Sequence, residues 1–170
     1  EQNISADWVI IGGGFTGLSA AKQLAYKGGS GLSIALLEAS QIGAGPAGRN
    51  SGFMIDLPHA LSGDSYVGNL SSDRELIRLN RVAQRFAISA AEEYQMPDHC
   101  VDRCGKINAS VDHNNQHHND IYAKQLDQLG EKYSMLSSDD MLAITGSEYY
   151  ANGLYTPGTI LLQPAEYITR

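Results

Sequence analysis

The fold is decided by the stretch Val9-Ile10-Ile11-Gly12-Gly13-Gly14-Phe15-Thr16-Gly17-Leu18. It joins a short apolar run, residues 8–11, to the following segment through glycines spaced as G-x-G-x-x-G. Beyond the glycines, leucine or alanine recurs at helical spacing until a glycine-rich turn at 28–31. A second apolar run, residues 32–37, has the length and composition of a strand. The pattern predicts a strand–helix–strand unit that opens an α/β fold with a Rossmann-like sheet.

The glycine turn between these elements has the features of a phosphate site. Gly12 allows a tight turn, Gly14 lets the backbone approach a pyrophosphate, and Gly17 lets the helix pack close to its strand. The helix N-terminus offers unpaired N–H groups and a positive dipole end to the phosphates. Glu38 closes the second strand, where a carboxylate accepts hydrogen bonds from a ribose diol and repels a 2′-phosphate. We therefore predict a dinucleotide site that disfavours NADP; the alternative is a structural turn rich in glycine.

A second loop, residues 44–53, contains further glycines and a proline. It follows the second strand, so it is expected beside the first turn, at the edge of the sheet where α/β proteins bind ligands. Arg49 can neutralise a phosphate there, and Asn50 and Ser51 can hydrogen-bond the polar edge of a ring. The alternative is a surface loop whose Arg49 pairs with an acidic neighbour. FAD and NAD both satisfy these constraints.

Composition excludes several classes of protein. The chain has 170 residues, 42% hydrophobic and 18% charged, which is enough to build a core. Its 12 basic and 19 acidic residues give a net charge of −7, so we expect no nucleic-acid partner. No apolar run approaches the ~18 residues that cross a bilayer, so we expect no stable membrane anchor. Two cysteines are too few for a disulfide framework and favour a cytoplasmic location.

The rest of the chain predicts further helices and strands. Ser72-Asp73 is expected to cap a long helix that runs to about Tyr94. Its core-facing stripe is expected to comprise Leu76, Leu79, Ala83, Phe86 and Ala90. A second amphipathic helix is expected over 121–133 and a short one near 139–144, with strands over 106–111 and 149–155. Pro164 is expected at the first position of a final helix.

The cysteines offer an alternative chemistry. Cys100 and Cys104 could form a redox disulfide, but the pyridine nucleotide-disulfide reductases place their cysteines soon after the second strand. We therefore expect ordinary reduced thiols. His59 follows a proline and is expected to be a loop residue and not a catalytic base.

The histidines offer a second alternative chemistry, a metal site. His113 and His117 are four residues apart, a spacing that can bind a transition metal on a helix, and His118 follows. No third ligand with suitable spacing accompanies them, and amide side chains surround them. We therefore expect a solvated helix start and predict no metal centre.

The sequences 9–18 and 36–38, followed by 48–52, resemble the D-amino acid oxidase family of FAD-dependent oxidoreductases, which includes glycine, sarcosine and γ-glutamylputrescine oxidases. The resemblance implies FAD as cofactor and oxidation of the C–N bond of a small amine or amino acid. Hydride passes to the flavin, the imine is hydrolysed, and the electrons go to oxygen or another acceptor. The glycines at 28–31 lengthen the common family turn, and we expect them to bulge outward without moving Glu38.

Carried over residue by residue, the resemblance assigns no catalytic residue, because the family's substrate-binding residues lie mostly in later sequence. It assigns two glycine-rich loops and the end of the second strand to the cofactor. These cofactor-binding residues are Gly12, Gly14, Phe15, Thr16, Gly17, Glu38, Ala39, Ser40, Arg49, Asn50, Ser51 and Gly52.

The resemblance also suggests how the chain is divided. Residues 1–97 are expected to form the N-terminal part of an FAD-binding domain, 98–156 the start of an α+β substrate domain, and 157–170 a return to the first domain. Because a helix is only just begun at Pro164, we expect a truncated chain that alone binds FAD weakly and turns over nothing. The alternatives are an NAD-dependent dehydrogenase and a dinucleotide-binding module without catalysis.

Overall fold

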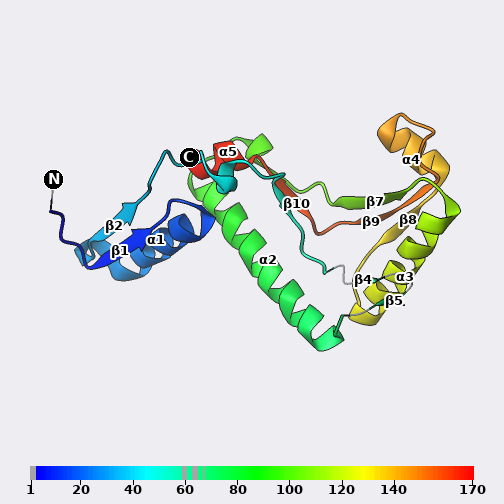
Figure 1. The fold of residues 1–170 in the computed structure, drawn as a ribbon, viewed down its shortest axis with the longest axis horizontal. Helices are drawn as coiled ribbons and strands as arrows, with labels where there is room; N and C mark the ends of the chain where they lie inside the picture. The colour runs from blue at the N-terminus through cyan, green and yellow to red at the C-terminus, as the bar shows by residue number, and fades with distance from the viewer. Residues whose placement is uncertain (1–2, 59–60, 63–64, 67) are drawn as a thin grey trace.

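The computed structural model describes residues 3–58, 61–62, 65–66 and 68–170, so His59 lies outside the described residues. The molecule is elongated, with the first strands and helix at one end and a larger sheet with its helices at the other (Figure 1). A long helix, α2 (Leu70–Glu93), runs between the two ends. The C-terminal helix, α5 (Pro164–Thr169), lies close to the upper end of α2 in this view.

The N-terminal end is a βαβ unit, as predicted. Strand β1 (Trp8–Ile11) pairs in parallel with β2 (Ile34–Leu37), and α1 (Phe15–Gly28) connects them through the short 3₁₀ turn η1 (Gly29–Gly31). η1 is exposed, which agrees with the expected outward bulge.

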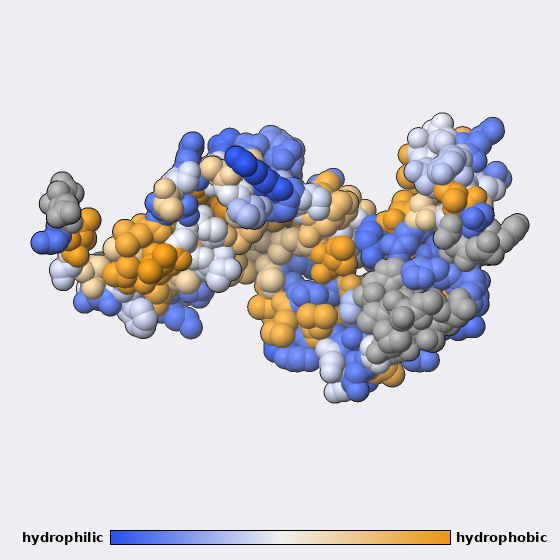
Figure 2. All heavy atoms as spheres, viewed as in Figure 1, coloured by the Kyte–Doolittle hydropathy of each residue, from blue (hydrophilic) through white to orange (hydrophobic). Residues whose placement is uncertain are grey.

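The apolar side chains of this βαβ unit are unexpectedly accessible. Trp8, Val9, Ile11 and Leu37 are each more than half exposed, and α1 contains no buried residue. They contribute to an apolar surface at this end of the molecule (Figure 2). The prediction that β1 is a buried strand is therefore wrong in this chain, because a two-stranded sheet with one helix cannot cover both of its faces.

Helix α2 differs from its prediction in its start and in its buried face. The side chain of Asn69 accepts hydrogen bonds from Ser71 N and Ser72 N, so the cap lies three residues before the predicted Ser72. Of the predicted stripe only Ala90 is buried, whereas Leu76 and Leu79 are 44% and 49% exposed. The buried residues of the helix are Asp73, Ile77, Gln84, Ala87 and Ala90.

The middle of the molecule is a three-stranded antiparallel sheet. Strand β10 (Ile160–Leu162) lies between β3 (Phe53–Met54) and β6 (Val101–Asp102). The 3₁₀ turn η3 (Asp98–Cys100) precedes β6, and α5 follows β10 with Pro164 in its first turn, as predicted. The ring hydroxyl of Tyr167 on α5 donates to Ala87 O on α2, which ties this sheet to the long helix.

The other end is a second antiparallel sheet, in which β9 (Asn152–Thr156) lies between β7 (Lys106–Ser110) and β8 (Ser134–Leu136). Helices α3 (His113–Leu129) and α4 (Ser138–Thr145) pack on it, and a short hairpin pairs β4 (Leu61–Ser62) with β5 (Ser65–Tyr66). α3 therefore begins eight residues before the predicted 121, and the histidine cluster opens that helix.

A hydrophobic core cluster lies under α3. Tyr122, Leu126 and Leu129 are buried together with Ile77 and Leu154, and Tyr133 packs against them. The sequence predicts a stripe of Tyr122, Leu126, Leu129 and Tyr133 on this helix. Its first three residues are buried as predicted, but the helix ends at Leu129, so Tyr133 packs against the core from beyond the helix. Among the described residues, none of the helices combines the length and the apolar character needed to cross a bilayer.

Candidate functional site

The first glycine turn has the geometry that the sequence predicts. Gly12 has a φ of +101°, a conformation that residues with a Cβ rarely adopt, and its N–H donates to Leu37 O at 2.7 Å. A Cβ added to Gly17 would overlap the carbonyl oxygen of Gly12. Gly17 is thus required for close packing of α1 on the turn, and the turn itself is joined to β2.

Glu38 lies directly against this turn. Its Oε2 accepts a hydrogen bond from Gly13 N at 2.7 Å, and its Oε1 accepts one from Ser40 N at 3.0 Å. These two N–H groups, with Gly13 first, lower the pKa of the exposed Glu38 carboxyl below its ordinary value. The carboxylate is therefore ionised at neutral pH and held at the end of β2. Each oxygen keeps lone-pair capacity for a diol.

The N-terminus of α1 is open in front of this carboxylate. Its N-cap residue, Gly14, carries no side chain that could cap the first N–H groups, and the first hydrogen bond within the helix runs from Leu18 N to Gly14 O. A Cβ added to Gly14 would have only the Cβ of Ala47 within 4 Å, at 3.9 Å. The backbone here is therefore accessible to a bulky anion, and Phe15 and Thr16 present their N–H groups to it.

The second glycine-rich loop folds back on itself around η2 (Pro46–Gly48). The side chain of Asn50 donates to Pro46 O and Ala47 O and accepts from Gly52 N. Asn50 thus shapes the loop, and its predicted contact with a ring edge stays a prediction. Gly52 has a φ of +78°, and a Cβ on it would overlap Leu162 O of β10.

Arg49 and Ser51 of this loop are exposed. Within the described part of the chain, Arg49 makes no ion pair, so the alternative in which it pairs with an acidic neighbour is not observed. Its guanidinium remains available for a phosphate.

A large cavity of about 730 Å³ adjoins the two loops. Phe15, Thr16 and Ser19 of α1 form one side, and residues of α2 form the other. Three of the five apolar α2 residues that the sequence assigned to the core lie here, together with Val82 and Ala87. The α2 residues that line the cavity are Leu79, Val82, Ala83, Phe86 and Ala87.

Two other residues in the cavity wall, Leu162 and Tyr167, were not predicted from the sequence. Tyr167 comes from α5, and its ring lies 6.2 Å from that of Phe15, centroid to centroid. Burial raises the pKa of its phenol, which is neutral as it donates to α2. Only a pattern that linked residues about 150 positions apart could have predicted this contact.

The two cysteines take no part in this site. Both are free thiols, Cys100 buried and Cys104 exposed. Burial, with the nearby Glu166 adding to it, raises the pKa of the Cys100 thiol. Cys100 is therefore protonated near neutral pH in the metal-free chain.

An open helix N-terminus, a glycine turn and an acidic side chain at the end of the next strand define a dinucleotide-binding α/β protein. The chain belongs to the family described as FAD dependent oxidoreductase (DAO), whose pattern matches residues 7–170. The family binds FAD, and the observed residues fit that cofactor: Gly14 leaves the phosphate approach clear, and Glu38 is ionised and held beside it. The recognised family, the Rossmann-like fold and the FAD prediction are thereby confirmed.

Individual relatives agree with this membership. γ-Glutamylputrescine oxidoreductase of Escherichia coli K12 is 44% identical over 56 residues, 33% of this chain and 12% of that protein. The probable oxidoreductase OrdL of Rhizobium meliloti is 28% identical over 170 residues, 96% of this chain and 38% of the relative. The glycine oxidase of Geobacillus kaustophilus has the same fold, with a TM-score of 0.77 at 19% identity over 96% of this chain and 42% of that one. The chain thus spans less than half the length of the proteins that it matches.

Proposed function

We propose that the whole protein containing these residues oxidises the C–N bond of a small amine or amino acid, with FAD as its electron acceptor. The observation that carries the proposal is the contact between Glu38 and Gly13 N in front of an open helix N-terminus. The choice of an amine is supported by the names of the relatives, a γ-glutamylputrescine oxidoreductase and a glycine oxidase. FAD supplies a two-electron acceptor for hydride from the carbon beside the nitrogen.

Different residues of the chain would bind different parts of the cofactor. The N–H groups of Phe15 and Thr16, with the backbone of Gly12, Gly14 and Gly17, would bind the pyrophosphate. Glu38 would bind the ribose hydroxyls, with Ala39 and Ser40 beside the adenine. Arg49 to Gly52 would approach the pyrophosphate and the flavin. The assignment rests on an ionised carboxylate, an open helix end and the exposed Arg49, which makes no ion pair with the described residues.

The cavity between α1 and α2 supports a role in excluding water. Its α2 side consists of aliphatic and aromatic side chains, including Leu79, Val82 and Phe86. An apolar wall beside a redox cofactor lowers the local polarity and keeps solvent from competing for reactive species. We assign this cavity to the region of the flavin and its substrate.

We also propose the division of the chain that the sequence suggests: residues 1–97 and 157–170 in the FAD-binding domain and 98–156 in the substrate domain. The contact of Tyr167 with Ala87 and Phe15 supports the return of 157–170 to the first part. The two free cysteines are compatible with a reducing compartment, and a cytoplasmic location is part of the proposal.

The test uses the whole protein, purified with its cofactor. We expect the visible absorbance of oxidised flavin and its loss under anaerobic conditions when an amine or amino acid substrate is added. A panel of primary amines, secondary amino acids and 2-hydroxy acids separates C–N from C–O oxidation. Admission of air then shows whether oxygen or another acceptor reoxidises the flavin.

Three results would contradict the proposal. Reduction by hydroxy acids alone would reject the C–N assignment. Bound nicotinamide without flavin would favour an NAD-dependent dehydrogenase. Bound FAD that no substrate of the panel reduces would favour a dinucleotide-binding module.

A further inference from the structure

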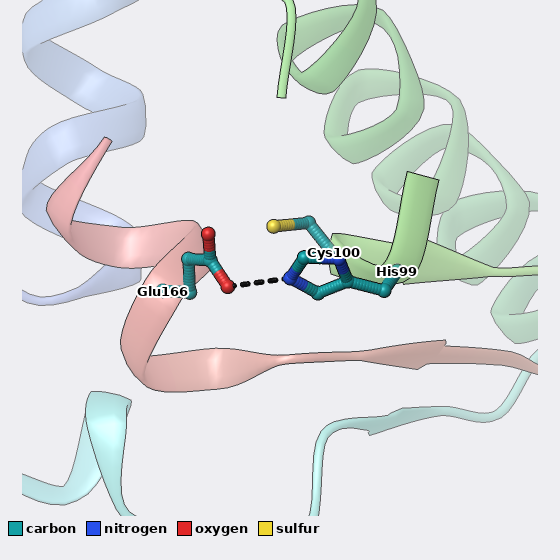
Figure 3. Close-up of side chains that lie close together, drawn as sticks. All are labelled: His99, Cys100 and Glu166. Carbon is teal, nitrogen blue, oxygen red and sulfur yellow. Dashed lines mark hydrogen bonds and ion pairs between the residues drawn. The ribbon is translucent and has the colours of Figure 1, made fainter. Parts of the chain in front are cut away.

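Three metal-ligating side chains meet where η3 approaches α5. His99 and Cys100 come from η3 and Glu166 from α5, and all three point toward one another (Figure 3). His99 Nε2 lies 2.7 Å from Glu166 Oε2, and the ligand atoms of the three residues all lie within 4.8 Å of one another. Among the described residues, these three side chains lie close enough together to hold one metal ion.

The backbone holds this cluster, which we call the η3–α5 cluster, in place. Gln163 N, directly before α5, donates to Cys100 O at 3.0 Å, and Cys100 N donates to Pro97 O at 2.8 Å. The β6–β10 pairing fixes the strands that continue from these two elements. The three side chains therefore come from two segments that backbone hydrogen bonds already hold together. This reduces the conformational entropy that the side chains lose when they bind an ion.

The donor set matches a borderline-soft divalent cation. Thiolate, imidazole and carboxylate are the three side-chain types that bind Zn²⁺, at about 2.0 to 2.3 Å. A tetrahedral site with such bonds places its ligand atoms roughly 3.3 to 3.5 Å apart. The observed spacings, from 2.7 Å to at most 4.8 Å, bracket these values, so small rotations of the side chains suffice.

The outer contacts of the cluster favour the same geometry. Arg170 binds the other carboxylate oxygen, Glu166 Oε1, at 2.8 Å and leaves Oε2 directed at His99. Such a partner orients a ligating carboxylate. The His99 side chain is 65% exposed, which gives an ion a route from solvent to the buried thiol. A His–Glu ion pair alone would not require the thiol of Cys100 to face the carboxylate.

We propose that His99, Cys100 and Glu166 bind one Zn²⁺ ion, with water as the fourth ligand. The ion would join η3 to α5 and so fix the place where residues 157–170 meet the rest of the chain. Binding exchanges the thiol proton of Cys100 for a Zn–S bond and breaks the hydrogen bond between His99 and Glu166. The proposal is independent of the function proposed above.

The test uses the whole protein, stripped with EDTA, incubated with Zn²⁺ and dialysed. Elemental analysis measures the stoichiometry, a chelator competition measures the affinity, and X-ray absorption at the zinc edge measures the ligand distances. We expect one equivalent of zinc with one sulfur at about 2.3 Å and lighter ligands at about 2.0 to 2.1 Å. Cys104→Ser, which removes the exposed neighbouring thiol, should bind zinc as the wild type does.

Two variants of the cluster complete the experiment. Cys100→Ser should remove the sulfur from the spectrum, and His99→Gln should weaken binding by about tenfold or more. Because His99 is exposed, its variant is expected to fold normally, which circular dichroism and flavin content check. Substoichiometric zinc in the wild type, a spectrum without sulfur, or equal losses in Cys104→Ser and Cys100→Ser would mean adventitious binding and would overturn the proposal.

Discussion

The two glycines at the start of α1 should respond differently to the same substitution. In Gly17→Ala the new methyl group would overlap the carbonyl oxygen of Gly12 and stand 3.1 Å from its carbonyl carbon. In Gly14→Ala the methyl group would meet only the Cβ of Ala47, at 3.9 Å, an ordinary contact. Gly14 also has φ −83° and ψ −177°, an extended conformation that alanine adopts freely.

These contacts set the expected magnitudes. Overpacking costs typically about 1–3 kcal/mol, and Gly17 faces rigid backbone that cannot rotate away. Alanine within a helix returns about 1 kcal/mol relative to glycine, so from the upper end of that range Gly17→Ala should lose a net of about 2 kcal/mol. Gly14→Ala should keep the free energy of unfolding within about 0.5 kcal/mol of the wild type. Its methyl group would instead obstruct the pyrophosphate and weaken FAD about tenfold or more, which corresponds to roughly 1.4 kcal/mol.

Both quantities are measured on the whole protein. Urea unfolding of the apoprotein gives the stability, and titration of the apoprotein with FAD gives the affinity. Gly31→Ala is the matched control, because no atom lies within 4 Å of its added Cβ and η1 is remote from the site. It should change neither quantity.

Two outcomes would refute the reasoning. If Gly14→Ala binds FAD as tightly as the wild type, the pyrophosphate does not lie on this turn. If Gly14→Ala loses as much stability as Gly17→Ala, the two glycines have the same packing role and the distinction drawn from the added methyl groups is wrong.

Further variants test the other contacts. Glu38→Gln should weaken FAD binding. Because the pKa of Glu38 is lowered, the part of the wild-type affinity that depends on its charge should persist at acidic pH and fall only below the ordinary pKa of 4.5. FAD titrations between pH 7 and 4 should show no such decline in the variant. Arg81→Ala removes the guanidinium that hydrogen-bonds the fully buried carboxylate of Asp56 and should cost about 3–5 kcal/mol in urea unfolding. Arg78→Ala removes the exposed ion pair with Glu75 and should cost less than about 1 kcal/mol. Equal losses of stability in Arg81→Ala and Arg78→Ala would contradict the argument from burial. Asn69→Ala should lower stability by about 1 kcal/mol, whereas Ser72→Ala should not; the reverse order would restore the cap that the sequence predicted.

The βαβ unit and its turn could be predicted because their requirements are local. Gly12 needs a positive φ, Gly17 needs space against the turn, and Glu38 follows at the end of the neighbouring strand. Each of these constraints acts within a short stretch of chain and leaves a mark at a fixed spacing. Helical periodicity likewise predicted the stripe of Tyr122, Leu126 and Leu129 under α3.

The face of α2 could not be predicted, because a polar contact outweighs periodicity there. Gln84 is buried since its amide donates to Met54 O at 2.7 Å and to Gly158 O at 2.9 Å. This turns the more apolar side of α2, with Leu79, toward the cavity instead of the core. The spacing of apolar residues along α2 cannot predict hydrogen bonds to carbonyl groups that are distant in the sequence, here Met54 O in β3 and Gly158 O.

The position of β10 has a consequence for how the protein is made. β10 is the central strand between β3 and β6, yet it is the last of the three to be synthesised. At roughly 5–20 residues per second, β3 waits on the order of 5 to 20 s on the ribosome before its partner emerges. Until β10 emerges, the edge of β3 and, once it is made, the edge of β6 are unpaired and open to other chains. Newly made protein should therefore depend on chaperones until residues 160–162 insert.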